Sequence, residues 1–121
     1  MPTCSKMYRR SFLGKIPEWV FSLKMGDWPI DVLISRHGNI GYINEIMGVY
    51  RIHQAGVWFG MRQNWEELTK ANMDAYHSLY AALGPKYKKI IKSVLHEQCV
   101  ESAEKYADMG ELAKAKESAG R

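Results

Sequence analysis

The 121-residue sequence has few cysteines and no long apolar run. Cys4 and Cys99 form no C-x-x-C pair; two reduced thiols are the simpler interpretation, and one long-range disulfide stays open. No apolar stretch approaches the length that spans a bilayer, and residues 1–6 lack the apolar core of a signal peptide. These absences predict a cytoplasmic protein, and peripheral contact at the inner membrane face stays open.

The sequence also lacks a strong excess of either charge. Its net charge is +4, and no run resembles a polybasic arm. This mild basic balance weakly favours an anionic ligand and decides nothing alone. Hydrophobic residues make up 46% of the chain and charged residues 25%, which is ordinary for a folded protein of one small domain or a piece of a larger one.

The two halves of the chain differ in composition. Residues 1–60 contain most of the glycines, prolines and tryptophans, whereas residues 61–121 have few residues that break helices. This change predicts a boundary near residue 60, with an irregular first part and a helical extension after it.

The first part is expected to mix short helices with two strands. Residues 11–21 suggest short helical turns interrupted at Pro17, and Asp27 is well placed to cap a helix with Pro29 in its first turn. Residues 40–43 and 46–53 are rich in β-formers, and Asn44-Glu45 separates them. The predicted fold class is therefore α/β, an α+β fragment with a strand pair and a mostly helical extension.

The second part is expected to be helical. A periodic apolar pattern follows Asn64, and Gly84-Pro85 ends that helix and starts the next. The lysines between positions 86 and 92 cover the outer side of the second helix, and the side chains predicted to point inward are Tyr87, Ile90, Ile91, Val94 and Leu95. Residues 103–115 resemble one helix-turn-helix step of a tetratricopeptide array.

Three segments together resemble family 2 glycosyltransferases of the GT-A type. They are Met7-Tyr8-Arg9-Arg10-Ser11-Phe12-Leu13, Gly26-Asp27-Trp28-Pro29-Ile30 and Val49-Tyr50-Arg51-Ile52-His53-Gln54-Ala55-Gly56-Val57-Trp58. The resemblance implies that residues 1–60 are the acceptor-side part of a catalytic region. The nucleotide-binding half and its D-x-D motif do not occur in this chain.

The resemblance implies a catalytic role for Asp27. In that family the corresponding carboxylate is the base that deprotonates an acceptor hydroxyl, which needs a carboxylate within hydrogen-bond reach of the hydroxyl. Asp is also a favoured helix N-cap. Both interpretations of Asp27 stay open at this stage.

Four further site residues follow from the same resemblance. His53 is expected to hold a divalent metal, Mg or Mn in the intact enzyme, or the diphosphate. Arg51 is expected to bind phosphate oxygens, and a surface ion pair is the alternative. Trp28 and Trp58 are candidates for stacking on sugar rings, although such residues more often belong to a core.

Three functions compete. The first is a fragment of an inverting glycosyltransferase that moves a sugar from a nucleotide-sugar donor to a carbohydrate acceptor. It is expected to be inactive alone and to need its missing N-terminal half or a protein partner. The second is a helical protein-interaction module, in which residues 64–119 of the helical extension 61–121 bind another protein through a tetratricopeptide-like surface. The third, a small basic nucleic-acid binder, ranks last because no nucleic-acid motif occurs, and no nucleic-acid partner is expected.

Overall fold

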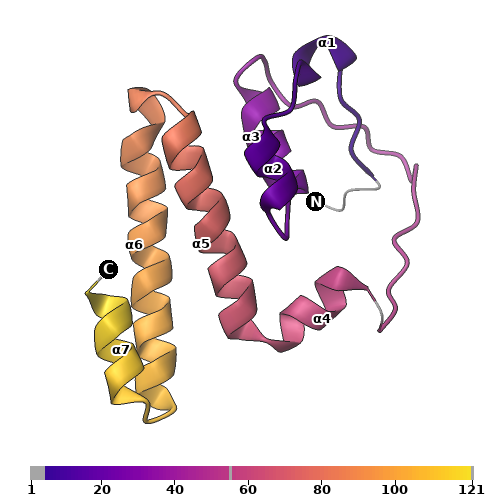
Figure 1. Ribbon diagram of the computed structural model, residues 1–121. Coiled ribbons are helices and arrows are strands. Elements are labelled where there is room, and N and C mark those ends of the chain that lie inside the picture. The colour runs from indigo at the N-terminus through magenta and orange to yellow at the C-terminus, as the bar shows by residue number, and fades with distance from the viewer. Residues whose placement is uncertain (1–4, 55, 121) are drawn as a thin grey trace. The chain divides into compact units, whose positions relative to one another are not determined.

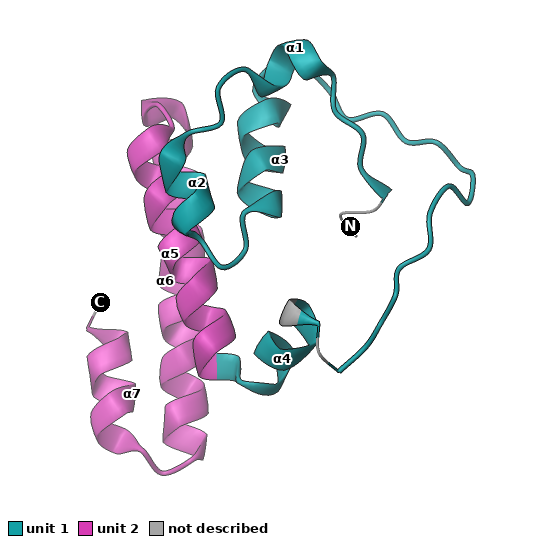
Figure 2. Ribbon diagram, turned by 45° about the vertical axis from the view of Figure 1, so that its right-hand side comes forward, with its two compact units in different colours: residues 1–65 teal, residues 66–121 magenta. Residues whose placement is uncertain are grey.

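The computed structural model describes residues 5–54 and 56–120 of the chain, and they fall into two compact units (Figures 1 and 2). The first unit is Met1–Trp65 and the second is Glu66–Arg121. The sequence predicts this division between residues 60 and 61. In the structure the first unit extends to Trp65, where α5 (Trp65–Ala82) begins.

The first unit contains four short helices. They are α1 (Arg10–Leu13), α2 (Glu18–Ser22), α3 (Asp27–Ser35) and α4 (Val57–Gln63). Pro17 is the N-cap residue of α2, so the predicted interruption is confirmed. The N-cap of α3 is Gly26 rather than Asp27. A Cβ atom at Gly26 would lie 3.1 Å from the carbonyl oxygen of Val20, so only glycine fits without a shift where α2 meets α3.

The predicted strand pair is wrong. Residues 38–54 form neither helix nor strand, and none of the described residues belongs to a sheet. Their apolar side chains are exposed, to 98% at Ile46 and 89% at Val49. A strand needs a partner and a covered face, and an isolated hairpin is marginal in water. Residues 38–54 are rich in β-forming types, but nothing in the described chain covers their apolar side chains. The predicted α/β fold class is therefore wrong, and the regular structure of the described residues is helical.

The second unit consists of α5 with α6 (Pro85–Asp108) and α7 (Leu112–Ala119). Gly84 caps α6 and Pro85 occupies its first turn, as the sequence predicts. The α7 helix packs against α6. The buried side chains of the three helices are small or medium: Ala71, Ala75 and Leu79 on α5, Ile91, Cys99 and Ser102 on α6, and Ala115 and Ser118 on α7. Cys99 is a free, buried thiol, and Cys4 lies outside the described residues.

Glycine geometry produces the turn between α6 and α7. Gly110 has φ of 78°, a left-handed conformation that favours glycine. Its amide donates to the carbonyl oxygen of Ala107 over 2.9 Å, and the amide of Glu111 donates to that of Tyr106 over 2.8 Å. These two bonds form a Schellman motif, which satisfies the last carbonyl groups of α6 and lets α7 fold back along it.

An ion pair joins α7 to the first turn of α5. Nζ of Lys114 on α7 lies 3.4 Å from Oε1 of Glu66 on α5 and 2.7 Å from Oε2 of Glu111. Burial, followed by a hydrogen bond with Glu66, raises the pKa of Tyr106. Glu66 therefore contacts side chains of both α6 and α7.

One inward prediction for α6 is wrong. Ile91 is buried, but Ile90 is 65% exposed. Successive residues on a helix point about 100° apart, so neighbouring apolar residues cannot both face the same narrow contact. Ile91 is therefore covered in the fold, and Ile90 is left on the exposed face of α6.

Candidate functional site

The clearest polar cluster of the first unit joins residues 6 and 8 to α3. Nζ of Lys6 donates a hydrogen bond to Oδ2 of Asp31 over 2.6 Å and lies 3.5 Å from Oδ2 of Asp27. The hydroxyl of Tyr8 donates to Oδ1 of Asp31 over 2.6 Å. We call these four residues, Lys6, Tyr8, Asp27 and Asp31, the aspartate cluster.

Helix geometry and burial create the aspartate cluster. Asp27 and Asp31 are four residues apart on α3, so their side chains lie on one face. The Lys6 side chain is only 4% exposed, while those of Asp27 and Asp31 are 40% and 29% exposed. A buried ammonium needs charged partners, and the two carboxylates supply them.

The titration behaviour of Lys6 and Tyr8 follows from these contacts. Burial lowers the pKa of Lys6, but the hydrogen bond with Asp31 and the charges of both carboxylates outweigh it and leave this pKa raised. Burial, the hydrogen bond to Asp31 and the two negative charges all raise the pKa of Tyr8. At neutral pH Lys6 is therefore an ammonium and Tyr8 a neutral donor.

The aspartate cluster is a set of internal hydrogen bonds that holds residues 6 and 8 against α3. Both oxygens of Asp31 already accept hydrogen bonds, from Lys6 and from Tyr8. Asp27 keeps a partly exposed carboxylate beside the Lys6 ammonium. The role of Asp27 as a base stays a prediction, and the feature that the structure adds is a tie between the start of the chain and α3.

The other predicted site residues lie elsewhere in the first unit. Trp28 is half-buried on α3 beside Asp27, and Trp58 is 44% exposed on α4. Arg51 and His53 are exposed in the irregular segment 38–54, so they do not lie on a strand as the predicted strand 46–53 required. Within residues 5–54 and 56–120, no three His, Cys, Asp or Glu side chains come together as a metal-binding group, so His53 has no such group around it.

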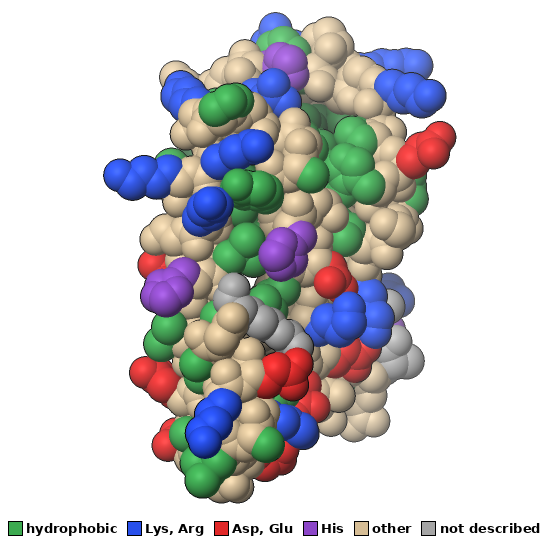
Figure 3. All heavy atoms as spheres, turned by 60° about the vertical axis from the view of Figure 1, so that its left-hand side comes forward, with side chains coloured by type: hydrophobic (Ala, Val, Ile, Leu, Met, Phe, Trp, Pro, Cys, Tyr) green, Lys and Arg blue, Asp and Glu red, His purple; other side chains and the backbone are tan. Residues whose placement is uncertain are grey.

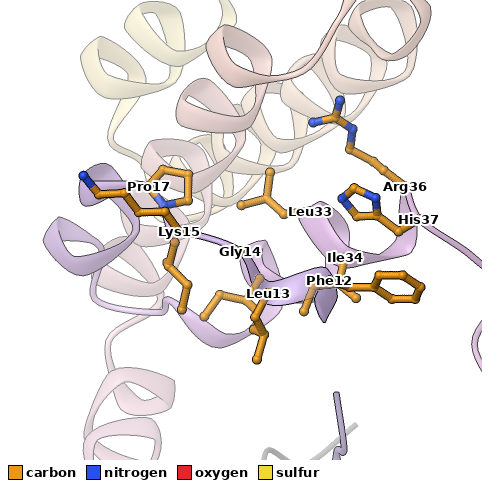
Figure 4. Close-up of a pocket in the computed structure, with 11 residues that line it drawn as sticks. Phe12, Leu13, Gly14, Lys15, Pro17, Leu33, Ile34, Arg36 and His37 are labelled. Atoms are coloured by element: carbon orange, nitrogen blue, oxygen red, sulfur yellow. The ribbon is translucent and has the colours of Figure 1, made fainter. Parts of the chain in front are cut away.

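The structure also contains a shallow cleft that the sequence does not reveal. Its volume is about 210 Å³, and its walls come from α1, α3 and the segments beside them: Phe12, Leu13, Gly14, Lys15, Ile16, Pro17, Ile30, Leu33, Ile34, Arg36 and His37. Figure 4 shows Arg36 and His37 on one side of the cleft and Lys15 on the other. Apolar side chains and the basic groups of Lys15 and Arg36 line the cleft together, and no carboxylate lies among the described lining residues.

Ring stacking fixes one wall of this cleft. The rings of Phe12 and His37 are stacked, with centroids 5.5 Å apart and an interplanar angle of 17°. The guanidinium of Arg9 lies 5.7 Å from the centroid of Phe12, within the range of a cation–π contact. These contacts join α1 to the end of α3. Sequence spacing gives no signal for them, nor for the partners of Lys6 and Tyr8.

No protein-family model, curated protein or solved structure matches this chain. The resemblance to family 2 glycosyltransferases is wrong, because the strand pair on which it depends does not form and no family supports it. The tetratricopeptide resemblance of residues 103–115 likewise finds no family, although a helix-turn-helix is present there. Short motifs of common residue types can recur by chance in unrelated chains.

Proposed function

We propose that the second unit is a helical protein-interaction module and that the outer face of α6 is its binding surface. The observation that carries this proposal is the arrangement of charge along α6. The four lysines at positions 86, 88, 89 and 92 lie in its first turns, while Glu97, Glu101, Glu104 and Asp108 lie in its second half, where Lys105 is the one lysine. Figure 3 shows side chains of both charges on the surface of the molecule.

This order of charges opposes the dipole of the helix itself. The beginning of a helix carries partial positive charge and its end partial negative charge, so lysines at the beginning and glutamates at the end are both unfavourable. Nζ of Lys86, Lys88 and Lys92 lies 5.6 Å, 4.9 Å and 5.9 Å from the centroid of a tyrosine ring. Such contacts are weak at a surface. The positive charges of the exposed Lys86 and Lys89 must therefore be compensated by solvent or by a partner.

Exposed apolar groups lie between these charges. Ile90 is 65% exposed and Val100 is 41% exposed, although α6 buries Ile91 and Cys99 on its opposite side. Apolar residues surrounded by charge are typical of the contacts that fix a helix on a partner surface. The α7 helix packs against α6, and the charged residues Lys86, Lys89, Glu97 and Glu104 of α6 are exposed.

Site-specific photocrosslinking tests the proposal. A photoreactive amino acid replaces Ile90 in one variant, Val100 in a second, and exposed Lys116 on α7 in a matched control. In cells that make the chain, we expect crosslinks to protein from positions 90 and 100 and only background from position 116. Equal yields at all three positions, or none at 90 and 100, would overturn the proposal.

A further inference from the structure

The outer face of α6 has a regular spacing. The exposed residues alternate in steps of four and three along one stripe: Lys86, Ile90, Ser93, Glu97, Val100 and Glu104. These steps average about 3.6 residues, the period of an α-helix, so the six residues lie on one straight face of α6. The buried residues Ile91, Cys99 and Ser102 lie on the opposite side of the helix, so the stripe is available to a helix from outside the unit.

The residues of the stripe are spaced symmetrically about Leu95, and the charges at the two ends of the stripe are complementary. Lys86 and Glu104 lie equally far in sequence before and after Leu95. The same holds for Ile90 with Val100 and for Ser93 with Glu97. If a second α6 runs antiparallel with its centre at Leu95, each of these residues comes level with its counterpart on the other helix. A lysine then meets a glutamate, an isoleucine meets a valine, and a serine meets a glutamate.

We propose that the partner of this face is a second copy of the chain, bound through an antiparallel pair of α6 helices. This inference rests on the proposed function of the module and names its partner. A two-fold axis repeats every contact, so each dimer contains two Lys86–Glu104 pairs and two Ile90–Val100 contacts. The basic half of each helix lies beside the acidic half of the other.

Antiparallel pairing also compensates the unfavourable order of charge in each helix. The lysines at the beginning of one α6 lie beside glutamates of the other, and the two helix dipoles oppose one another. A parallel pair would place Lys86 against Lys86 and Glu104 against Glu104, and like charges across an interface are repulsive. The charge pattern therefore selects the antiparallel arrangement.

The proposed interface between the two α6 helices is small, so the affinity of the dimer is low. Only Ile90 and Val100 contribute large apolar groups on the stripe, and interfaces of limited area belong to weak, transient complexes. The dimer is accordingly weak, and added salt weakens it further because its charged pairs are exposed to solvent.

Charge exchange between the two ends of α6 tests the proposal. Sedimentation equilibrium on the full chain at low salt should show a concentration-dependent dimer. Lys86→Glu alone and Glu104→Lys alone should each weaken dimerisation by about tenfold or more, because each creates two like-charge pairs. An equimolar mixture of these two single variants should dimerise, since the glutamate introduced at position 86 of one chain then meets the lysine introduced at position 104 of the other. The double variant should dimerise as well as the unaltered chain.

Each outcome of this experiment is decisive for the dimer. A chain that stays monomeric at every concentration overturns it, as do single variants that associate like the unaltered chain or a mixture that fails to associate. Circular dichroism on each variant verifies that the helices are intact. The mass of the photocrosslinked product separates this inference from the proposed function: twice the chain mass supports the dimer, whereas a different protein at position 90 overturns the dimer and leaves the module function standing.

Discussion

Nζ of Lys6 lies 2.6 Å from Oδ2 of Asp31, and the Lys6 side chain is almost completely buried. The pair holds the start of the described chain against α3, and Tyr8 adds a second hydrogen bond to the same carboxylate. This contact gives the first unit a polar clamp whose stability and pH dependence can both be measured.

Removing the charge of Asp31 should destabilise the first unit. In Asp31→Asn the buried Lys6 ammonium loses the carboxylate at 2.6 Å and retains that of Asp27 at 3.5 Å, and we expect a loss of about 2 kcal/mol in the free energy of unfolding. Urea unfolding followed by circular dichroism gives this value.

The Lys70–Asp74 pair is the matched control for Asp31→Asn. Its charged atoms are also 2.6 Å apart, but its side chains are 76% and 52% exposed. Asp74→Asn should therefore change the stability by less than about 0.5 kcal/mol. Equal losses for the two variants would show that burial of Lys6 contributes nothing.

The first unit should lose stability in alkali. The pKa of Tyr8 is raised above its ordinary value of 10.0 and that of Lys6 above 10.5. Above these ordinary values the unfolded chain releases protons that the folded chain still holds, so the free energy of unfolding falls as pH rises through them. Urea titrations at a series of pH values from neutral to strongly alkaline measure the slope.

Tyr8→Phe isolates the contribution of the hydroxyl to this pH dependence. The variant has no titrating group at position 8, so its alkaline loss should be shallower than that of the unaltered chain. At neutral pH it should be less stable by about 1 kcal/mol, because one hydrogen bond to Asp31 is missing. An unchanged alkaline slope would contradict the assignment of Tyr8.

Reversing the charge of Lys86 should stabilise α6 as a monomer. Lys86→Glu places a negative charge at the positive end of the helix, and the expected gain is about 0.5 kcal/mol. Thermal unfolding at low protein concentration, followed by circular dichroism, measures it. Lys116→Glu, in the last turn of α7, should shift the stability in the opposite direction; the same sign for both would contradict the dipole argument.

Replacing Gly110 should destabilise the turn between α6 and α7. Gly110→Ala forces a Cβ atom into a left-handed conformation with φ of 78°, which costs about 1 kcal/mol. Gly38 has no positive φ, and a Cβ atom there would meet nothing within 4 Å. Gly38→Ala should therefore have little effect on thermal stability, and a similar loss at both positions would contradict the role of Gly110.

The irregular segment 38–54 should be cut first by chymotrypsin. Tyr42 and Tyr50 are exposed and lie in neither helix nor strand, so their peptide bonds fit a protease without prior unfolding. Tyr76, half-buried in the middle of α5, is the internal comparison. Mass spectrometry of the early products should find cleavage after Tyr42 and Tyr50 before cleavage after Tyr76.

No helix within the described ranges is long and apolar enough to cross a membrane, in agreement with the lack of long apolar runs in the sequence. The placement of the helices around Gly84 and Pro85 also followed from sequence. Proline at the first turn and glycine before it act through local backbone geometry, which does not depend on distant residues. The same holds for the interruption at Pro17.

The strands, the polar cluster and the exposed face of α6 depended on distant residues. The β-forming residues 40–53 predict strands, but a strand forms only where another strand and an apolar surface meet it, and the described part of the fold supplies neither. The contact of Lys6 with Asp31 requires a chain closure over 25 positions, and no local pattern encodes it. The sequence by itself determined where α5 begins and where it gives way to α6 at Gly84-Pro85, because capping and breaking signals are local. The tertiary structure decided that Ile91 is covered and Ile90 is not, because burial depends on which helices pack against α6 and from which side.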